Sequence, residues 1–176
     1  MIRCYVTDRR QGDVLASAAR AIHEHVDMIQ VREKDLDGRE LFDLVCRVRE
    51  LASGTSTRIL VNDRLDIALA AGVDGVHLPS NGLPAPRVRP FVKCLGVSVH
   101  TLEEALAAEV AGADFIVFGP VFETPGKLAV GVGPLRTVAS AIKIPVLAIG
   151  GITLENSPAV LAAGASGIAG IRLFQA

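Results

Sequence analysis

The chain has 176 residues, half of them hydrophobic, which predicts a single domain spanning 1–176 with a sizeable core. A formal net charge of −1 gives no reason to expect nucleic-acid binding, so any anionic ligand must be held by local donors. No apolar run reaches the roughly 18 residues of a membrane span, and no secretory signal is recognisable, so we expect a cytoplasmic protein without a membrane partner.

Short apolar runs alternate with segments of helical period along the whole chain, which is the pattern of βα units around a parallel sheet. The runs predict eight strands, at 2–7, 28–32, 58–61, 75–78, 93–99, 115–118, 145–149 and 167–171. Helices are predicted between them at 13–25, 38–52, 64–71, 101–111, 134–141 and 153–163, and the proline-rich segment 79–90 has room only for a short one.

A four-residue motif, Ala-Gly-x-Asp or Ala-Gly-x-Ser, recurs at 71–74, 111–114 and 163–166, before the fourth, sixth and eighth predicted strands. Its glycine suits the left-handed residue that ends a helix, and the polar residue starts the next strand. Repetition at every second strand predicts a closed (β/α)8 barrel of duplicated units, because an open sheet gives no reason for it.

The chain is shorter than the usual minimum of about 200 residues for such a barrel, so we expect the last helix to be missing. Leu173 and Phe174 would then form an apolar patch that a second subunit covers. This patch predicts a homodimer.

In a barrel of this kind the reacting groups lie at the C-terminal ends of the strands. The second predicted strand ends in Gln30, Arg32 and Lys34, which alternation sends to one side, so two cations and an amide would meet at the barrel mouth. A solvated charged loop is the alternative. The third strand ends in Asn62 and Asp63. Asp63 is either a Mg²⁺ ligand or a cap of the following helix, and taken alone the cap is favoured.

His100, at the end of the fifth predicted strand, is the candidate general acid/base, because an imidazole both accepts and donates protons near pH 7. His77, which ends the fourth strand, is the competitor, and we assign it to packing. The loop after the sixth strand carries Thr124 and Lys127 and is interpreted as a substrate lid, with an ordinary surface loop as the alternative.

The seventh predicted strand stops at Gly150 and Gly151, where the missing Cβ atoms let a ligand approach the backbone. If Thr153 caps the next helix, the free N–H groups at its start suit a phosphate. A structural turn is the alternative.

Taken together, these strand ends resemble the family of thiamine phosphate synthase and its relative TenI, the thiazole tautomerase. The similarity runs through the segments 5–8, 30–36, 62–64, 75–78, 96–100, 118–122 and 148–152, in this order and on matching strands. The resemblance implies a TIM barrel and a phosphorylated thiazole as ligand. It also implies contacts to substrate, metal or phosphate at Asn62, Asp63, Ser98, Thr124, Lys127, Gly150 and Gly151.

The departures from the family pattern bear on which of the two activities to expect. The synthase joins hydroxymethylpyrimidine diphosphate to thiazole phosphate and needs Mg²⁺, held by Asp63 and a second aspartate after the fourth strand, but segment 79–83 has no carboxylate. Gly126 replaces a hydroxyl residue before Lys127, and Arg172 stands near the place of the family's serine phosphate contact. The tautomerase needs only a phosphate anchor and an acid/base group.

We therefore expect a metal-independent TenI-type thiazole phosphate tautomerase, without a cofactor, in which His100 and Lys34 are catalytic. The remaining site residues are assigned to the substrate (Gln30, Arg32, Asn62, Ser98, Thr124 and Lys127) and to its phosphate (Gly150, Gly151 and Arg172). One alternative is thiamine phosphate synthase with Mg²⁺ at Asp63. A second alternative is a regulator that binds the phosphorylated ligand without turnover.

Overall fold

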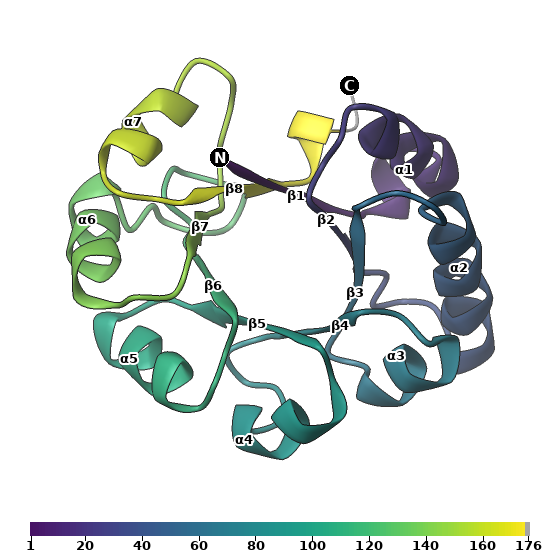
Figure 1. Ribbon diagram of the computed structural model, residues 1–176. Coiled ribbons are helices and arrows are strands. Elements are labelled where there is room, and N and C mark those ends of the chain that lie inside the picture. Colours follow the sequence, from purple (N-terminus) through teal and green to yellow (C-terminus); the bar gives the residue numbers. More distant parts are fainter. Residues whose placement is uncertain (175–176) are drawn as a thin grey trace.

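Eight parallel strands form a closed barrel in the computed structural model, which describes residues 1–174 (Figure 1). In chain order they are β1 (Ile2–Val6), β2 (Met28–Val31), β3 (Arg58–Asn62), β4 (Gly75–Leu78), β5 (Cys94–Val99), β6 (Phe115–Phe118), β7 (Val146–Ala148) and β8 (Gly167–Gly170). Each strand pairs with the next along the chain, and β8 closes the barrel by pairing with β1. The predicted (β/α)8 barrel is confirmed.

An outer ring of helices surrounds the barrel (Figure 1). The α-helices are α1 (Val14–His23), α2 (Gly38–Leu51), α3 (Leu65–Ala71), α4 (Ala85–Val88), α5 (Leu102–Val110), α6 (Val132–Ala141) and α7 (Ser157–Ala162), with 3-10 turns η1 (Arg9–Gln11), η2 (Arg89–Phe91) and η3 (Arg172–Phe174). Side-chain caps by Asp13, Asp37 and Thr101 explain where α1, α2 and α5 begin. Within residues 1–174, no helix has the length and apolar character needed to cross a bilayer.

Helix α7 begins at Ser157, later than predicted, so the expected cap by Thr153 is wrong. Thr153 and Asn156 bond to each other instead: the Thr153 N–H donates to Asn156 Oδ1 (2.8 Å), and the Asn156 N–H donates to Thr153 Oγ1 (3.2 Å). Pro158 lies in the first turn of α7, where proline is tolerated, and this favours a helix start there. A turn, not a helix start, therefore follows Gly151.

The repeated motif ties pairs of strands together at the N-terminal end of the barrel. Before an even-numbered strand, the polar residue of the motif donates its N–H to the carbonyl of one residue on the preceding odd-numbered strand, and its side chain accepts the N–H of the same residue. The pairs are Asp74 with Ile59, Asp114 with Leu95, and Ser166 with Val146. A fourth pair, Asp27 with Arg3, completes the series before β2. The sequence pattern did not reveal this fourth pair, because His25 (φ 57°) occupies the left-handed position that is a glycine in the three copies of the motif.

The end of the described chain is better covered than expected. After β8 the described residues form only η3, and Phe174 is 5% exposed, with its ring centroid 6.0 Å from that of Tyr5 and the Arg3 guanidinium 5.4 Å from its centre. Leu173 is half-buried and packs against the core between the sheet and the helices. The expectation of an uncovered patch is therefore wrong, because Tyr5 and Arg3 of β1 supply the surface on which Phe174 packs. The apolar patch therefore no longer supports a homodimer.

Candidate active site

The C-terminal ends of the strands open into a cavity of about 600 Å³. Nearly all of the residues singled out from the sequence line it: Gln30, Arg32, Lys34, Asn62, His77, Ser98, His100, Thr124, Lys127, Gly150, Gly151 and Arg172. This is the end of the barrel where proteins of this fold hold their reacting groups. Asp63 is the exception, since it does not line the cavity.

Asp63 carries a carboxylate that has no hydrogen-bond or salt-bridge partner among residues 1–174. Its backbone is left-handed (φ 62°), and the N-cap of α3 is Arg64, with no side chain capping that helix, so the interpretation of Asp63 as a cap is wrong. The carboxylate faces the connection after β4, because a Cβ at Gly82 would lie 2.8 Å from Asp63 Oδ1. Within the described chain it accepts no hydrogen bond and forms no ion pair, since the neighbouring Arg64 binds Asp66 (2.7 Å).

The chemistry of this donor set is compatible with one magnesium ion. Residues 1–174 contain no group of three or more His, Cys, Asp or Glu side chains that could hold a metal by themselves. However, Mg²⁺ is commonly bound by one or two carboxylates, with water and substrate phosphate oxygens completing its shell. Asp63 supplies one such carboxylate, next to the cavity.

Four basic side chains at the mouth lack an acidic partner. Among the described residues, none of Arg32, Lys34, Lys127 and Arg172 takes part in an ion pair. An arginine at the rim differs, since Arg9 binds Asp35 at 2.7 Å. The mouth is therefore locally positive although the chain has a formal net charge of −1. Unpaired cations at a cavity attract and hold anionic ligands.

A line of three hydrogen-bonded side chains crosses the floor of the cavity. Gln30 from β2 lies with Nε2 2.5 Å from His77 Nδ1, and His77 from β4 lies with Nε2 2.8 Å from Ser98 Oγ on β5. His77 is only 2% exposed, and its ring packs edge-on against Phe115. Burial first, and the charge of Arg32 second, lower the pKa of His77 to about 4. His77 is thus a neutral, packed group at pH 7.

His100 lies at the rim, where its two ring nitrogens have different roles. Nδ1 lies 2.6 Å from the carbonyl oxygen of Gly119. A carbonyl only accepts, so Nδ1 carries the hydrogen and Nε2 keeps a lone pair when the ring is neutral. The backbone N–H of His100 donates to Glu104 Oε2 (2.6 Å), which anchors the end of β5 to α5. His100 can therefore act as a base through Nε2.

Gly150 and Gly151 lie just after β7, in left-handed conformations (φ 96° and 62°). A Cβ at Gly150 would collide with Pro120, and one at Gly151 would lie 2.8 Å from the carbonyl oxygen of Glu123. Neither glycine N–H donates to an acceptor within residues 1–174. These two free donors suit a phosphate, although they belong to a turn rather than to the predicted helix start.

The loop after β6 folds back on itself beside these glycines. Thr124 and Lys127 form an antiparallel bridge in which the Lys127 N–H donates to the Thr124 carbonyl (3.0 Å), and Gly126 has φ 78°. This tight turn brings Thr124 and Lys127 to the cavity. Their interpretation as part of a substrate lid stays a prediction.

Glu33, which no sequence pattern singled out, organises the ends of β1 and β2. Glu33 is 5% exposed, and its carboxylate accepts hydrogen bonds from Thr7 Oγ1 (2.6 Å) and the Arg9 N–H (3.0 Å). Thr7 Oγ1 in turn accepts the N–H of Arg32 (2.9 Å). The pattern that could have identified Glu33 is the alternation of side chains along an extended segment, which sends Glu33 to the side opposite to Arg32 and Lys34. Its bonds hold in place the backbone that presents these two cations.

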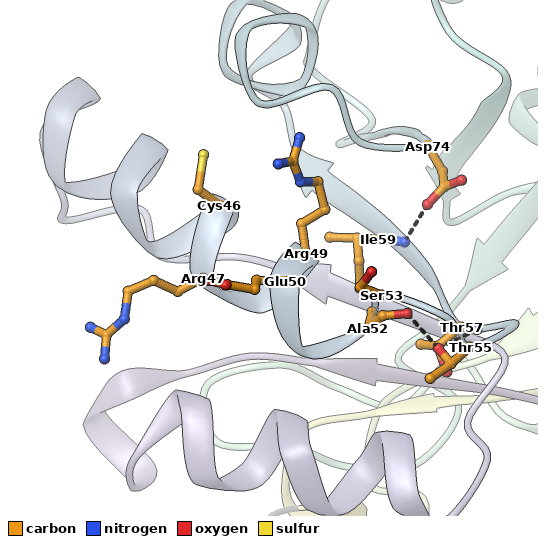
Figure 2. A pocket seen from close by; sticks show the side chains of 10 residues that line it. All are labelled: Cys46, Arg47, Arg49, Glu50, Ala52, Ser53, Thr55, Thr57, Ile59 and Asp74. Carbon is orange, nitrogen blue, oxygen red and sulfur yellow. Dashed lines mark hydrogen bonds between the residues drawn. The ribbon is translucent and has the colours of Figure 1, made fainter.

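A second hollow, of about 650 Å³, lies on the outside of the barrel between α2 and the start of β3 (Figure 2). Two of its polar groups already serve the fold: Arg49 donates to the Ala71 carbonyl at the end of α3 (2.6 Å), and Asp74 accepts the Ile59 N–H (2.8 Å). Asp74, the polar residue of the repeated motif at 71–74, belongs to the N-terminal end of the barrel, which supports stability rather than chemistry in this fold. We therefore assign this hollow no ligand.

Comparisons with known proteins point to one family. The family model described as "Thiamine monophosphate synthase" matches residues 4–174. A "Putative thiamine-phosphate synthase" of Geobacter sulfurreducens is 47% identical, covering 93% of this chain and 82% of the relative. A "Thiamine-phosphate synthase" of Methanospirillum hungatei is 48% identical, covering 81% and 72%. The solved structure of a thiamine phosphate pyrophosphorylase from Pyrococcus furiosus superposes with a TM-score of 0.90 at 37% identity, covering 97% of this chain and 85% of the other.

Proposed function

The chain belongs to the thiamine monophosphate synthase family, and on that premise we propose that it is a transferase that joins hydroxymethylpyrimidine diphosphate to thiazole phosphate, releasing pyrophosphate. The names of the relatives favour this activity over the tautomerase expected from the sequence. Both activities belong to thiamine biosynthesis and use a phosphorylated thiazole.

One observation carries the proposal: the mouth offers unpaired anion-binding groups in two places. Arg32 and Lys34 follow β2, whereas the free N–H groups of Gly150 and Gly151, with Arg172, lie at the ends of β7 and β8. β1 separates the two groups in the barrel. A synthase must hold a diphosphate and a monophosphate together, while a tautomerase holds one phosphate. Two anion sites are therefore more than the tautomerase needs.

Magnesium enters this proposal through Asp63. When bound there, Mg²⁺ would neutralise charge on the departing pyrophosphate. The residues of the chain itself have three tasks: Asp63 holds the ion, Arg32 and Lys127 offset the remaining negative charge, and Gly151 anchors the thiazole phosphate. With one carboxylate instead of two, we expect weak magnesium binding in the absence of the diphosphate.

The tautomerase remains a second candidate because of two particular observations. The connection after β4 carries no carboxylate near Asp63, and Nε2 of His100 is a free base at the rim. A non-catalytic regulator is the third candidate. A cytoplasmic location and a homodimer stay predictions under all three.

The deciding experiment offers the purified protein each set of substrates. With hydroxymethylpyrimidine diphosphate, thiazole phosphate and Mg²⁺, we expect thiamine phosphate, and we expect chelation of Mg²⁺ to stop its formation. Asp63→Asn keeps the size of the side chain and tolerates the left-handed backbone, so the fold should persist. Its magnesium requirement should rise by at least about tenfold. Conversion of the tautomeric thiazole phosphate alone, without thiamine phosphate formation, would instead support the second candidate.

A further inference from the structure

The segment that carries Arg32 and Lys34 lies beyond the paired part of the barrel. β2 ends at Val31, and no strand pairing of β2 extends past this residue. The sheet itself therefore does not hold the backbone from which the two cations project. Instead, hydrogen bonds tie this segment to the end of β1, at Thr7 and Arg9.

The central contacts between the two strand ends are buried. The hydroxyl of Thr7, which is fully buried, accepts the Arg32 N–H (2.9 Å) and donates to Glu33 Oε1 (2.6 Å). Glu33 is 5% exposed, and the Arg9 N–H lies 3.1 Å and 3.0 Å from its two carboxylate oxygens. Donors face both oxygens, so the carboxylate accepts at both. Hydrogen bonds of this kind to a carboxylate are stronger than bonds between neutral groups, so they hold the segment firmly.

A further contact to the same segment is exposed and provides a matched control. Asp35 pairs with the Arg9 guanidinium at 2.7 Å, and the two side chains are 53% and 47% exposed. Exposed ion pairs of this kind contribute little to holding a structure together. Asp35 thus shares with Glu33 its segment, its formal charge and its partner residue, but not its burial.

We propose that Thr7 and Glu33 are positioning residues that fix the backbone beneath Arg32 and Lys34, so that both cations meet the same diphosphate group. Among the described residues, the two cations line the cavity, whereas Thr7 and Glu33 do not, so these two act through the cations. Holding binding groups in place before the ligand arrives lowers the cost of ordering them. The assignment of this anion to the diphosphate substrate rests on the proposed function.

Positioning and charge predict opposite effects of a change at Glu33. Removal of its negative charge alone should strengthen the binding of an anion at the mouth, because Coulomb repulsion falls. Loss of the fixed backbone should weaken that binding. In Glu33→Gln the amide oxygen can keep the bond from Thr7, but the amide NH₂ then faces the Arg9 N–H, donor against donor. The sign of the change in affinity therefore separates the two effects.

The experiment titrates inorganic pyrophosphate, and separately inorganic phosphate, into ¹⁵N-labelled full-length protein, and follows the amide signals of Lys34 and Gly151 by NMR. At Lys34, both Glu33→Gln and Thr7→Val should weaken pyrophosphate binding by about three- to tenfold, within the loss expected for a hydrogen bond to a charged group. Thr7→Ser keeps the hydroxyl and should restore the wild-type affinity. Asp35→Asn should bind pyrophosphate at least as tightly as the wild type. Phosphate binding at Gly151 should be unchanged in every variant.

Several results would overturn the proposal. They are unchanged or tighter pyrophosphate binding in Glu33→Gln or Thr7→Val, equal losses in the serine and valine variants of Thr7, and an equal loss of phosphate binding at Gly151. If a variant does not fold, the wild-type protein still decides, because the Arg32 amide hydrogen should exchange slowly with deuterated solvent although it lies beyond β2. Exchange as fast as in an unstructured peptide would refute the clamp. The proposed function can fail separately, since a protein that makes no thiamine phosphate can still show these differences in pyrophosphate binding.

Discussion

Two substitutions of His100 separate a proton carrier from an orienting group. His100 Nδ1 donates to the Gly119 carbonyl at 2.6 Å, so Nε2 is the nitrogen with the free lone pair. Asparagine places its amide N–H near the position of Nδ1 and can keep the bond to Gly119. Glutamine places its amide near the position of Nε2. Neither amide titrates, so both variants lack the base, and only His100→Asn keeps the bond to Gly119.

The two roles predict effects of different size. Loss of the single hydrogen bond to Gly119 would cost about 0.5–1.5 kcal/mol, or a factor of about 2 to 10 in rate. Loss of a positioned general acid/base would cost about 10² to 10⁴. For the proposed synthase we expect both variants to keep thiamine phosphate formation within about tenfold, with His100→Asn closer to the wild type. The reason is that in the proposed synthase Mg²⁺ and the unpaired cations, not His100, would stabilise the departing pyrophosphate.

The assay measures kcat for thiamine phosphate formation at saturating Mg²⁺, and in parallel the conversion of the tautomeric thiazole phosphate. A loss of more than about 100-fold in thiamine phosphate formation by both variants would refute the assignment of His100 as an orienting group in the synthase. A loss of that size in the thiazole conversion alone would assign the acid/base role to His100 in the second candidate function.

Three further predictions concern stability, measured by urea unfolding. Asp63→Ala should lower the free energy of unfolding by about 1–2 kcal/mol relative to Asp63→Asn, because alanine tolerates φ 62° poorly; equal stability would show that the backbone relaxes. The pKa of His77 is lowered to about 4 in the folded state, so the unfolded chain binds the proton first, and stability should fall as the pH drops from about 6.5 to 4, by up to about 3 kcal/mol in total. His77→Gln should flatten this contribution, and an unchanged slope would contradict the assignment. His25→Gly should raise the free energy of unfolding by about 0.5–1 kcal/mol, since glycine relieves the left-handed strain at φ 57°; a loss of stability would contradict this.

The barrel and the position of the mouth could be predicted from the sequence because both depend on local patterns. Apolar runs between turn residues marked the strands to within one residue at either end. Alternation placed Gln30, Arg32 and Lys34 on one side, and the cavity is lined by all three. The glycine pair at 150–151 stood out because a buried run stopped there.

What the sequence did not reveal depends on contacts between distant segments or on unusual backbone. Phe174 is buried because Tyr5, at the other end of the chain, lies beside it. The line from Gln30 through His77 to Ser98 joins three strands, so no local pattern announces it. Asp63 was misread as a cap, because an aspartate before a helix normally has an extended backbone and not a left-handed one.

The four hydrogen-bonded pairs at the N-terminal end of the barrel, Asp27 with Arg3, Asp74 with Ile59, Asp114 with Leu95 and Ser166 with Val146, also affect how the protein unfolds. Each pair joins an odd-numbered strand to the even-numbered strand that follows it, which divides the barrel into four βαβ quarters: β1–β2, β3–β4, β5–β6 and β7–β8. These bonds lie inside the quarters and never between them. Among residues 1–174, the seams between quarters lack this double bond, and the connection from β4 to β5 contains only the short α4 and η2. Each double bond ties the N-terminal ends of two neighbouring strands, so we expect these two ends to open together in partial unfolding. The amide hydrogens of Arg3, Ile59, Leu95 and Val146 should be among the slowest to exchange with deuterated solvent.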